Sequence, residues 1–489
     1  MHKTGLQNQI ARPQMSLTVL PITQFENQSL IFAILYVACA ATVTLHALFT
    51  KRNVPTVIGW IALAWLSPFF GALVYICLGI NRVSRRGQKL FQAGRVLAPA
   101  ASRGRLNNSW QERLAIPIGK ITGQETSTGT ISEILRCGDE AYPKMLQAIN
   151  DAQSSIALST YIFRTDTLGL RFIEALANAH KRGVEVRVLI DGIGGGYLRS
   201  KAYYALLRQG VPVARFLHTT LLWKMPLLNL RLHKKLLLID GDLAFVGGLN
   251  IDADNVLAGH PEFPVIDTHF SIQGAVVRQI AKVFQDDWLF STSEVLEGPA
   301  WNSGVNSAKG NPSRAMASGP DQNANHLMLV LLTAINSARH TIKIATPYFL
   351  PDEVVLTALQ LASLRGVSVN LVVPAVNDHH IMTWATRAHV RPLLEKGCNL
   401  WRSPRPFDHS KLMTVDDSWC LIGSANWDTR SLRLSFELSV EFYDTDAATR
   451  LSSIIDLKCT QPITLAEIDG RLGILKVRDA AARLLMAYL

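Results

Sequence analysis

The stretch that decides the fold is LHKKLLLID at residues 232–240, followed by GGLN at residues 247–250. The same pattern returns as HSKLMTVD at residues 409–416 and GSAN at residues 423–426. In both copies the lysine lies two positions after the histidine, the aspartate seven and the asparagine seventeen. A core strand that happens to carry a histidine could explain one copy, but not two with identical spacing. The two segments are therefore predicted to form the active site.

Each motif combines residue types that suit chemistry on a phosphate group. The apolar runs at residues 236–239 and 412–415 predict buried strands, and alternation along a strand places each histidine beside its lysine. An imidazole, an ammonium and an amide at one point predict a site where one histidine attacks phosphorus and the other protonates the leaving alkoxide. The candidate catalytic residues are His233, Lys235, Asp240, His409, Lys411 and Asp416, and the candidate substrate-binding residues are Asn250, Asn426, Gly248 and Ser424.

The composition limits the classes of protein. With 489 residues the chain exceeds one ordinary domain. Its net charge of +11 suits nucleic acid, an anionic membrane surface or an anionic substrate equally well. The six cysteines are scattered without a CxxC pair, which indicates a reducing compartment and neither a disulfide framework nor a zinc site. Asp378-His379-His380 has metal-ligand residue types, but no partner spacing supports a metal site. No metal and no cofactor are expected.

Two apolar runs lie near the N-terminus, after a polar segment at residues 1–28. Residues 30–49 are uncharged and, as a helix about 30 Å long, match a bilayer core. Residues 57–80 form the second run, in which Pro68 is tolerable as a kink. A cleaved signal peptide is the alternative for the first run, but that run is long for one and a second run follows at once. We therefore expect two transmembrane helices within residues 29–80.

A basic cluster follows the second run. Five cations lie between residues 82 and 95, a denser group than Lys51-Arg52 between the two runs. Because positively charged loops stay on the cytoplasmic side, the large C-terminal part is expected in the cytoplasm. The cluster also suits anionic lipid head groups. The five cations are Arg82, Arg85, Arg86, Lys89 and Arg95.

The rest of the chain alternates between helical and strand patterns and contains an internal repeat. ALANAHKRGVEVRVLID at residues 175–191 returns as ALQLASLRGVSVNLVVP at residues 358–374. Such alternation predicts an α/β layered domain, and a duplicated domain can pair about a pseudo-two-fold axis and bring two motifs into one site. The expected segments are a basic connector at residues 81–130, domains at residues 131–299 and 325–489, and a linker at residues 300–324.

These residues resemble the phospholipase D superfamily, whose double HxKxxxxD signature the two motifs carry, and within it the bacterial cardiolipin synthases. The resemblance covers residues 30–450, including DTH at residues 267–269, TPYF at residues 346–349 and NWDTRS at residues 426–431. It implies two tandem phospholipase D-like α-β-α sandwich domains after the membrane helices. It also implies a multi-pass protein of the bacterial inner membrane with its catalytic domains on the cytoplasmic side. One departure is Val265-Ile266, where the family commonly carries Trp-Arg; this concerns recognition of the acceptor.

The resemblance further implies a metal-free transfer between lipids. One phosphatidylglycerol gives its phosphatidyl group to His233, and glycerol leaves with a proton from His409. A second phosphatidylglycerol, deprotonated by His409, then attacks and yields cardiolipin; His409 as the nucleophile is the alternative. The phosphate oxygens are expected to bind Lys235, Lys411, Asn250 and Asn426.

Two pairs of carboxylates have different expected roles. By family position, Asp267 should orient His233 and Glu437 should orient His409, as carboxylates do in other histidine pairs. Asp240 and Asp416 carry the third letter of the motif. We expect them to be structural, because seven extended residues would place them about 23 Å from the histidines.

Other functions share the motif. Water as acceptor would make the protein a phospholipid hydrolase, and phosphatidylethanolamine could replace phosphatidylglycerol as donor. A nuclease would use the basic charge on DNA, but the two apolar runs and the lack of a basic-aromatic pattern argue against a nucleic acid. The expected partners are the membrane and anionic phospholipids. The apolar run at residues 221–230 is either a membrane-facing lip or buried packing. Trp401, Arg402 and Arg405 either guide a phosphate or are solvated loop residues.

Overall fold

The computed structural model describes residues 22–51, 54–79, 106, 109–218, 230–302, 310–320, 323 and 325–484. The chain divides into two compact units, Met1–Asn81 and Arg82–Leu489, and each is considered by itself. Three sequence predictions lie outside the described residues. They concern the polar segment up to residue 21, the basic cluster at residues 82–95 and the apolar run at residues 221–229.

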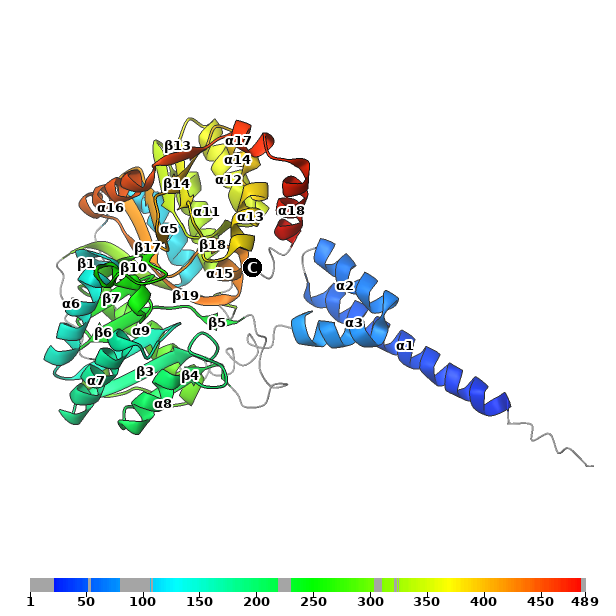
Figure 1. Cartoon of the computed structure of the whole chain (residues 1–489), viewed down its shortest axis with the longest axis horizontal. Helices are drawn as coiled ribbons and strands as arrows, with labels where there is room; N and C mark the ends of the chain where they lie inside the picture. The colour runs from blue at the N-terminus through cyan, green and yellow to red at the C-terminus, as the bar shows by residue number, and fades with distance from the viewer. Residues whose placement is uncertain are drawn as a thin grey trace, which may run out of the picture. The chain divides into compact units, whose positions relative to one another are not determined.

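The N-terminal unit contains one helix that is long and apolar enough to cross a membrane. Its apolar part, Leu30–Thr50, has 21 residues and a mean hydropathy of 2.1. The second predicted span is interrupted at Ser67, because Pro68 has no N–H to continue the helical hydrogen bonds. The structure thus has one long helix where the sequence predicted two, followed by shorter ones (Figure 1). These elements are α1 Ile22–Thr50, α2 Val54–Leu66, α3 Pro68–Val74 and η1 Tyr75–Gly79.

Polar and aromatic contacts join α1 to the helices that follow it. His46 Nδ1 lies 2.7 Å from Tyr75 Oη, and the two rings meet edge to face. Trp65 Nε1–H donates to Thr44 Oγ1 at 3.1 Å. Hydrogen bonds between apolar helices satisfy polar groups that a bilayer could not. The helices α1, α2 and η1 are therefore joined by side-chain contacts within this unit.

The C-terminal unit is built on one 16-stranded sheet that two repeats share (Figure 1). From the centre outward, the first repeat runs β1-β9-β7-β6-β2-β3-β4, and the second repeat matches it with β10-β19-β17-β16-β11-β13-β14. β1 and β10 pair antiparallel where the repeats meet. This matched order confirms the predicted α/β fold with two repeated domains.

Helices cover both faces of the sheet in each repeat. One core cluster lies under α6, α7 and α8 of the first repeat, and a second lies under α5, α11 and α12 of the second. A third cluster, under α9 and α16, contains residues from both repeats. The elements up to the junction are α5 Ser109–Thr122, β1 Ser127–Arg136, α6 Cys137–Asp151, β2 Ser155–Thr160, α7 Thr167–Lys181, β3 Glu185–Asp191, α8 Lys201–Arg208, β4 Val213–Phe216, β5 Arg231–Leu232, β6 Leu236–Ile239, β7 Leu243–Gly247, β8 Val265–Ile266, β9 Thr268–Gln273 and α9 Val276–Thr292. The elements after it are β10 Asn311–Ser318, α11 His326–Ser337, β11 Thr341–Ala345, β12 Phe349–Leu350, α12 Glu353–Leu364, β13 Ser368–Pro374, α13 His380–His389, α14 Arg391–Glu395, β14 Asn399–Ser403, β15 Phe407–Asp408, β16 Leu412–Val415, β17 Trp419–Gly423, β18 Trp427–Asp428, α15 Thr429–Arg433, β19 Ser435–Phe442, α16 Thr445–Lys458, β20 Gln461–Ile463, α17 Leu465–Asp469 and α18 Gly473–Leu484.

Local sequence signals set the ends of the repeated helices. The Asp166 carboxylate accepts the N–H of Gly169 at 2.8 Å and caps the start of α7. The helices α7 and α12 are each followed by a glycine with positive φ, Gly183 at 92° and Gly366 at 90°. After Gly183 the chain enters β3, and after Gly366 it enters β13. The repeated segments RGVEV and RGVSV thus each contain a helix end followed by a strand.

Two segments differ from the predicted domain limits. The stretch predicted as a linker, residues 300–324, contains β10, whose residues pair with both β1 and β19. The stretch predicted as a connector, residues 81–130, contains α5, which packs on the second repeat; Trp110 Nε1–H donates to Ser337 O at 2.8 Å. The second repeat therefore takes part of its core from chain that precedes the first.

Short strands cross from each repeat into the other just before the histidines. β5 pairs parallel with β19, and β15 pairs parallel with β8. Consequently the N–H of His233 donates to Phe436 O at 2.9 Å, and the N–H of His409 donates to Ile266 O at 2.7 Å. This exchange places both histidines at the junction between the repeats.

Candidate active site

Both predicted histidines line one cavity. The cavity has a volume of about 530 Å³, which is within the range of small-molecule sites. The two histidines come from different repeats, so the cavity exists only where the repeats meet. The predicted residues that line it are His233, His409, Asn250, Asn426 and Gly248.

Each histidine is oriented by a carboxylate of the other repeat. His233 Nδ1 lies 2.9 and 3.0 Å from the two carboxylate oxygens of Glu437. His409 Nδ1 lies 2.8 Å from Asp267 Oδ2. The predicted assignment, Asp267 to His233 and Glu437 to His409, is therefore wrong. The two carboxylates were identified correctly, but the strand exchange carries each histidine across to the opposite partner.

These contacts determine which ring nitrogen can react. An ionised carboxylate can only accept, so with Glu437 and Asp267 ionised the Nδ1 of each ring carries the proton, and Nε2 holds the free lone pair when the ring is neutral. The rings of Tyr161 and Tyr348, which also line the cavity, meet His233 and His409 edge to face at 5.2 and 6.3 Å between centroids. Nε2 of each imidazole is thus the atom available to a substrate.

Positive charges around the first histidine favour its neutral form. Burial, together with the charges of Lys235 and Lys411, holds the pKa of His233 well below its usual value of 6.5. Burial raises the pKa of its partner Glu437 to about 7. At neutral pH the His233 ring is therefore uncharged, as a nucleophile requires.

The second histidine faces a carboxylate that keeps its charge. Burial alone would raise the pKa of Asp267, but Lys411 and the hydrogen bond from His409 outweigh it and hold that pKa below its usual value. Burial and Lys411 lower the pKa of His409, while Asp267 opposes them. The two halves of the site thus differ: His409 has the more persistent negative partner and accepts a proton more readily.

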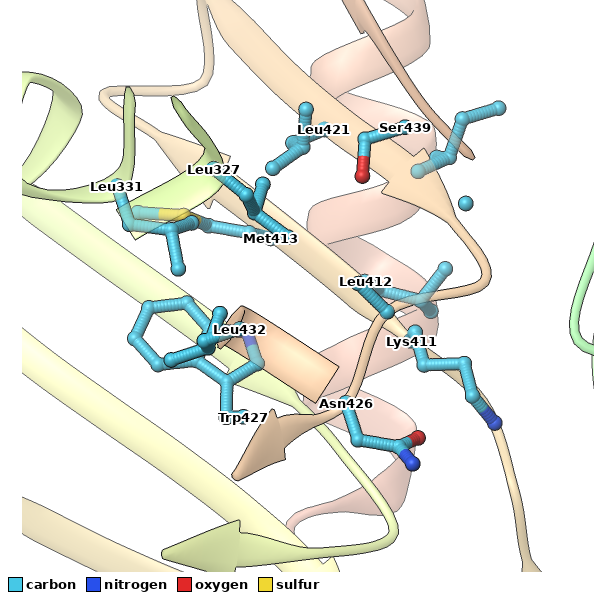
Figure 2. Close-up of a pocket in the computed structure, with 13 residues that line it drawn as sticks. Leu327, Leu331, Lys411, Leu412, Met413, Leu421, Asn426, Trp427, Leu432 and Ser439 are labelled. Carbon is cyan, nitrogen blue, oxygen red and sulfur yellow. The ribbon is translucent and has the colours of Figure 1, made fainter. Parts of the chain in front are cut away.

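The two motif lysines are buried beside their histidines. Lys235 Nζ donates to His233 O at 2.8 Å, and Lys411 Nζ donates to His409 O. Burial lowers the pKa of Lys411 to about 8. Figure 2 shows the Lys411 and Asn426 side chains projecting to the same side of the second repeat, away from the apolar layer that contains Trp427. The two side chains thus lie on the same side of the second repeat, and their predicted part in binding phosphate oxygens stays a prediction.

The candidate substrate-binding residues that follow the two motifs differ in their contacts. Asn250 Oδ1 accepts the N–H of Ile162 at 3.2 Å, whereas Asn426 Oδ1 is buried without a hydrogen-bond partner in the described residues. Ser424 does not face the cavity: its hydroxyl donates to Glu437 Oε2 at 2.5 Å. A Cβ at Gly248 would lie 2.2 Å from Asp267 Oδ2. The predicted substrate-binding role thus does not suit Ser424, and glycine at 248 makes room for a carboxylate.

The motif aspartates lie away from the histidines. Asp240 accepts the backbone N–H groups of Gln153, Ser154 and Ser155 at 2.7–3.2 Å, at the start of β2. Asp416 accepts three N–H groups before β11 in the same way, from Arg339, His340 and Thr341 at 2.7–2.9 Å. These contacts support the expectation that both aspartates are structural and not catalytic.

Two arginines in the cavity were not predicted as site residues. Arg231, in β5, and Arg430, in α15, both line the cavity, and the charge of Arg430 contributes to the lowered pKa of His233. Arg430 lies 176 positions after Asp254, as His409 does after His233. At the equivalent position the first repeat therefore has an acid, Asp254, in place of the arginine. Asp252, two residues before it, pairs with Arg164 at 2.6 Å. Comparison of the repeats could have revealed this asymmetry.

No group of three or more histidine, cysteine, aspartate and glutamate side chains suited to a metal ion occurs in the described residues. His379 lines the cavity, and its Nε2 lies 3.7 Å from Asp378 Oδ2. The Asp378 carboxylate also accepts the Tyr348 hydroxyl at 2.7 Å. One histidine and one aspartate are fewer than the three or four protein ligands of a zinc site.

Comparison with known proteins agrees with this geometry. Residues 145–288 and 331–457, more than half of the chain, match the family model "Cardiolipin synthase, PLD-like domain". The chain is 30% identical to "Cardiolipin synthase 1" of Bacillus anthracis over 418 residues, which cover 81% of each chain. It is 33% identical to "Cardiolipin synthase" of Alkalihalophilus pseudofirmus over 459 residues, which cover 90% of each.

A solved structure shows the same fold. The phosphatidylserine synthase of Haemophilus influenzae matches with a TM-score of 0.60 at 16% identity, over 78% of this chain and 100% of that one. At this identity the likeness concerns the fold alone, whereas the family model and the relatives concern the sequence. The chain therefore belongs to the cardiolipin synthase family of phospholipase D-like phosphatidyltransferases.

Proposed function

We propose that this protein is a membrane-bound cardiolipin synthase that transfers a phosphatidyl group from one phosphatidylglycerol to another. The observation that carries the proposal is the pair of imidazoles, His233 and His409, that face one cavity with Nε2 free. Each imidazole has a carboxylate on Nδ1 and a buried lysine beside it. Such a pair provides a nucleophile and a proton donor on one phosphate.

In the first step, Nε2 of neutral His233 attacks the phosphorus of the donor lipid. A phosphorus–nitrogen bond forms, the bond from phosphorus to the glycerol oxygen breaks, and His409 gives its Nε2 proton to that oxygen so that glycerol leaves. Lys235 and Lys411 stabilise the charge that develops on the phosphate oxygens. The buried, unpartnered Asn426 Oδ1 suits a hydroxyl of the glycerol head group, since it can only accept.

In the second step, neutral His409 takes the proton of a hydroxyl group on the second phosphatidylglycerol. The oxygen attacks phosphorus, the phosphorus–nitrogen bond breaks, and His233 is released in its neutral form with cardiolipin as the product. Glu437 would balance the positive charge on the phosphorylated ring through Nδ1. The two steps return both histidines to their starting protonation states.

The two roles follow from the unequal carboxylates. His233 has the more strongly lowered pKa, so it is the better supplier of a free lone pair at neutral pH. His409 faces Asp267, whose pKa lies below its usual value, so an imidazolium there is better compensated. This difference supports His233 as the nucleophile and His409 as the acid and base.

The lining of the cavity suits lipids with anionic phosphates. Arg231 and Arg430 supply positive charge beside His233. On the side of the second histidine, the wall is apolar, with Phe263, Val265 and Phe407. Val265 stands where the family commonly carries tryptophan, and the arginine that commonly follows is Ile266 here. We infer that Arg231 and Arg430 take over part of the recognition of phosphate.

We also propose a two-pass membrane anchor with the catalytic unit on the cytoplasmic side. The helix α1 supports one pass, and the hydrogen bond between Trp65 and Thr44 supports a return pass through the interrupted α2 and α3. A break at proline is tolerated when neighbouring helices satisfy the freed backbone groups. The basic cluster at residues 82–95 supports the cytoplasmic side.

The test is the lipid product of the purified full chain in phosphatidylglycerol vesicles, alone and then with phosphatidylethanolamine. The proposal expects cardiolipin and free glycerol from phosphatidylglycerol alone, and neither from the His233→Ala variant. Phosphatidic acid as the main product would show a hydrolase instead. Cardiolipin that forms only with phosphatidylethanolamine would show that the donor is the other lipid.

A further inference from the structure

The C-terminal helix α18 carries an apolar stripe that no described residue covers. Ile474, Val477 and Leu484 are 77%, 69% and 80% exposed. Ala481, between the last two, is exposed as well. Steps of three, four and three residues place all four side chains on one face of a helix. A contiguous exposed stripe of this kind indicates a contact surface, unlike single exposed apolar residues.

The opposite face of α18 attaches the helix to the wall of the catalytic cavity. Asp479 and Ala482 are buried against the protein, and the Arg478 guanidinium lies 4.2 Å from the centre of the Trp384 ring of α13. Met382 of the same α13 lines the catalytic cavity. The stripe is therefore held on the outside of an element whose inside faces the reacting lipids.

One exposed side of α18 is basic. Lys476 and Arg483, seven positions apart, are both exposed on the same side of the stripe, and the only acid within the helix, Asp479, is buried and paired with Arg478 at 2.7 Å. An apolar face bordered by cations is the pattern of a helix that lies in the interface of an anionic membrane.

A second cationic feature lies beside the same helices. A cavity of about 490 Å³, here called the arginine cavity, is lined by Arg387, Arg402 and Arg405. Arg402 pairs with Glu467, the one carboxylate in the lining, at 2.5 Å, whereas Arg387 and Arg405 leave positive charge in the cavity. Arg387 belongs to α13, and the charge of Arg471, just before α18, adds to burial in lowering its pKa. An anion in this cavity would relieve the repulsion between these charges.

We propose that α18 lies in the interface of an anionic bilayer, with Ile474, Val477 and Leu484 among the acyl chains and a phospholipid phosphate in the arginine cavity. The helix α13, which lines the catalytic cavity, is then held next to the bilayer that contains the substrate lipids. This inference rests on the proposed function in one respect: the catalytic cavity takes bilayer phospholipids.

The charges argue for a bilayer over a second copy of the chain. If two α18 stripes packed on each other, Lys476 and Arg483 of each copy would lie beside the contact without an exposed carboxylate of α18 to pair with. The stripe of a 12-residue helix is also small against the ~800 Å² that each partner buries in a stable interface. A lipid surface has neither difficulty.

The first test is amide hydrogen exchange of the full chain in nanodiscs of phosphatidylcholine, with and without phosphatidylglycerol. Peptides of α18 should exchange more slowly when phosphatidylglycerol is present. The matched control is α12, which exposes Leu361 and Leu364 but contains no lysine or arginine, and should not change. Equal exchange of α18 in both discs would overturn the proposal, and so would slowing that depends on protein concentration, since it would show a second copy.

The second test separates docking from catalysis. Val477→Asp and Arg405→Gln should each raise the apparent KM for phosphatidylglycerol in vesicles, Val477→Asp by roughly tenfold, and leave kcat unchanged. In both variants, activity on a short-chain phosphatidylglycerol dissolved as monomers should be unaffected. The control Leu361→Asp should change neither the KM in vesicles nor the activity on the short-chain lipid. An unchanged KM, or equal loss on both substrates, would contradict the proposal. The exchange measurement needs no activity and no variant, so it stands if the proposed reaction fails.

Discussion

Glu437 of the second repeat accepts a hydrogen bond from Nδ1 of His233 in the first repeat, at 2.9 Å. The reverse pair, Asp267 of the first repeat with His409 of the second, is equally close at 2.8 Å. Neither repeat therefore contains a complete half-site, because each supplies the carboxylate for the other's imidazole. The half-sites are not equivalent, since Glu437 is also bound by Ser424 while Gly248 leaves space beside Asp267.

The first prediction concerns Glu437→Gln. An amide keeps the size of the side chain but permits the wrong tautomer of His233, so we expect kcat to fall by roughly 10²- to 10⁴-fold with little change in KM. Steady-state assays with phosphatidylglycerol measure both constants. Ser424→Ala is the control, because it leaves the Glu437 carboxylate on His233 and removes only the hydroxyl that donates to Glu437 and accepts the Leu438 N–H, so it should cost much less. Equal losses in the two variants would show that the effect arises from packing.

The second prediction distinguishes the two histidines through the leaving group. Asp267→Asn should weaken His409 as an acid, but a donor whose leaving group is p-nitrophenolate needs no proton to depart. We therefore expect a rapid burst of p-nitrophenolate of about one per enzyme, followed by slow turnover as the phosphohistidine waits for an activated acceptor. Stopped-flow absorbance measures the burst. If His409 were the nucleophile, Glu437→Gln would show the burst and Asp267→Asn would not.

The third prediction is a bell-shaped dependence of kcat/KM on pH. Neutral His233 exists above its lowered pKa, and its partner Glu437 is ionised above its pKa of about 7, so activity should fall as the pH drops below 7. The acid His409 must be protonated, and charged Lys411 exists below its pKa of about 8, so activity should also fall as the pH rises, most steeply through 8. Lys411→Arg should move the alkaline limb to higher pH, because a guanidinium stays charged. An unmoved limb would assign it to another group, with Lys235→Arg as the next variant.

The fourth prediction is that Asp240 stabilises the fold and takes no part in the reaction. Asp240→Ala removes the acceptor of three backbone N–H groups, so we expect the free energy of unfolding to fall by roughly 1.5–3 kcal/mol. Well below its unfolding temperature, the variant should keep kcat close to that of the unchanged protein. Thermal denaturation and kinetics on the same sample test this, and Asp416→Ala is the matched variant. A loss of kcat in the fully folded protein would show a catalytic role.

The fifth prediction concerns the buried ion pair between Lys234 and Asp287. Lys234 Nζ lies 2.7 Å from the carboxylate, and both side chains are less than a tenth exposed. Asp287→Ala leaves a buried charge without compensation and should cost about 3–5 kcal/mol of unfolding free energy. The double change Lys234→Met with Asp287→Leu should cost far less, because no charge remains. Denaturant unfolding of the three proteins checks the order, which a similar loss in both variants would contradict.

Local patterns were sufficient for much of the architecture. The repeat at residues 175–191 and 358–374 predicted an alternation of helices and strands, and the apolar runs at residues 236–239 and 412–415 predicted buried strands. The structure has these elements, because capping and strand burial depend on neighbouring residues. The prediction was weaker for the second apolar run. Its composition suits a membrane span throughout, but backbone hydrogen bonding at Ser67 and Pro68 divides it into shorter helices.

The sequence by itself predicted that His233 and His409 would meet, since two motifs with the same spacing in a duplicated domain favour a shared site, and both line one cavity. Only the tertiary structure decided which carboxylate each histidine meets. His233 and Glu437 are 204 positions apart, and their contact depends on the pairing of β5 with β19 across the repeat junction. Register between strands of different repeats is set by packing of the whole sheet, which no local spacing reports.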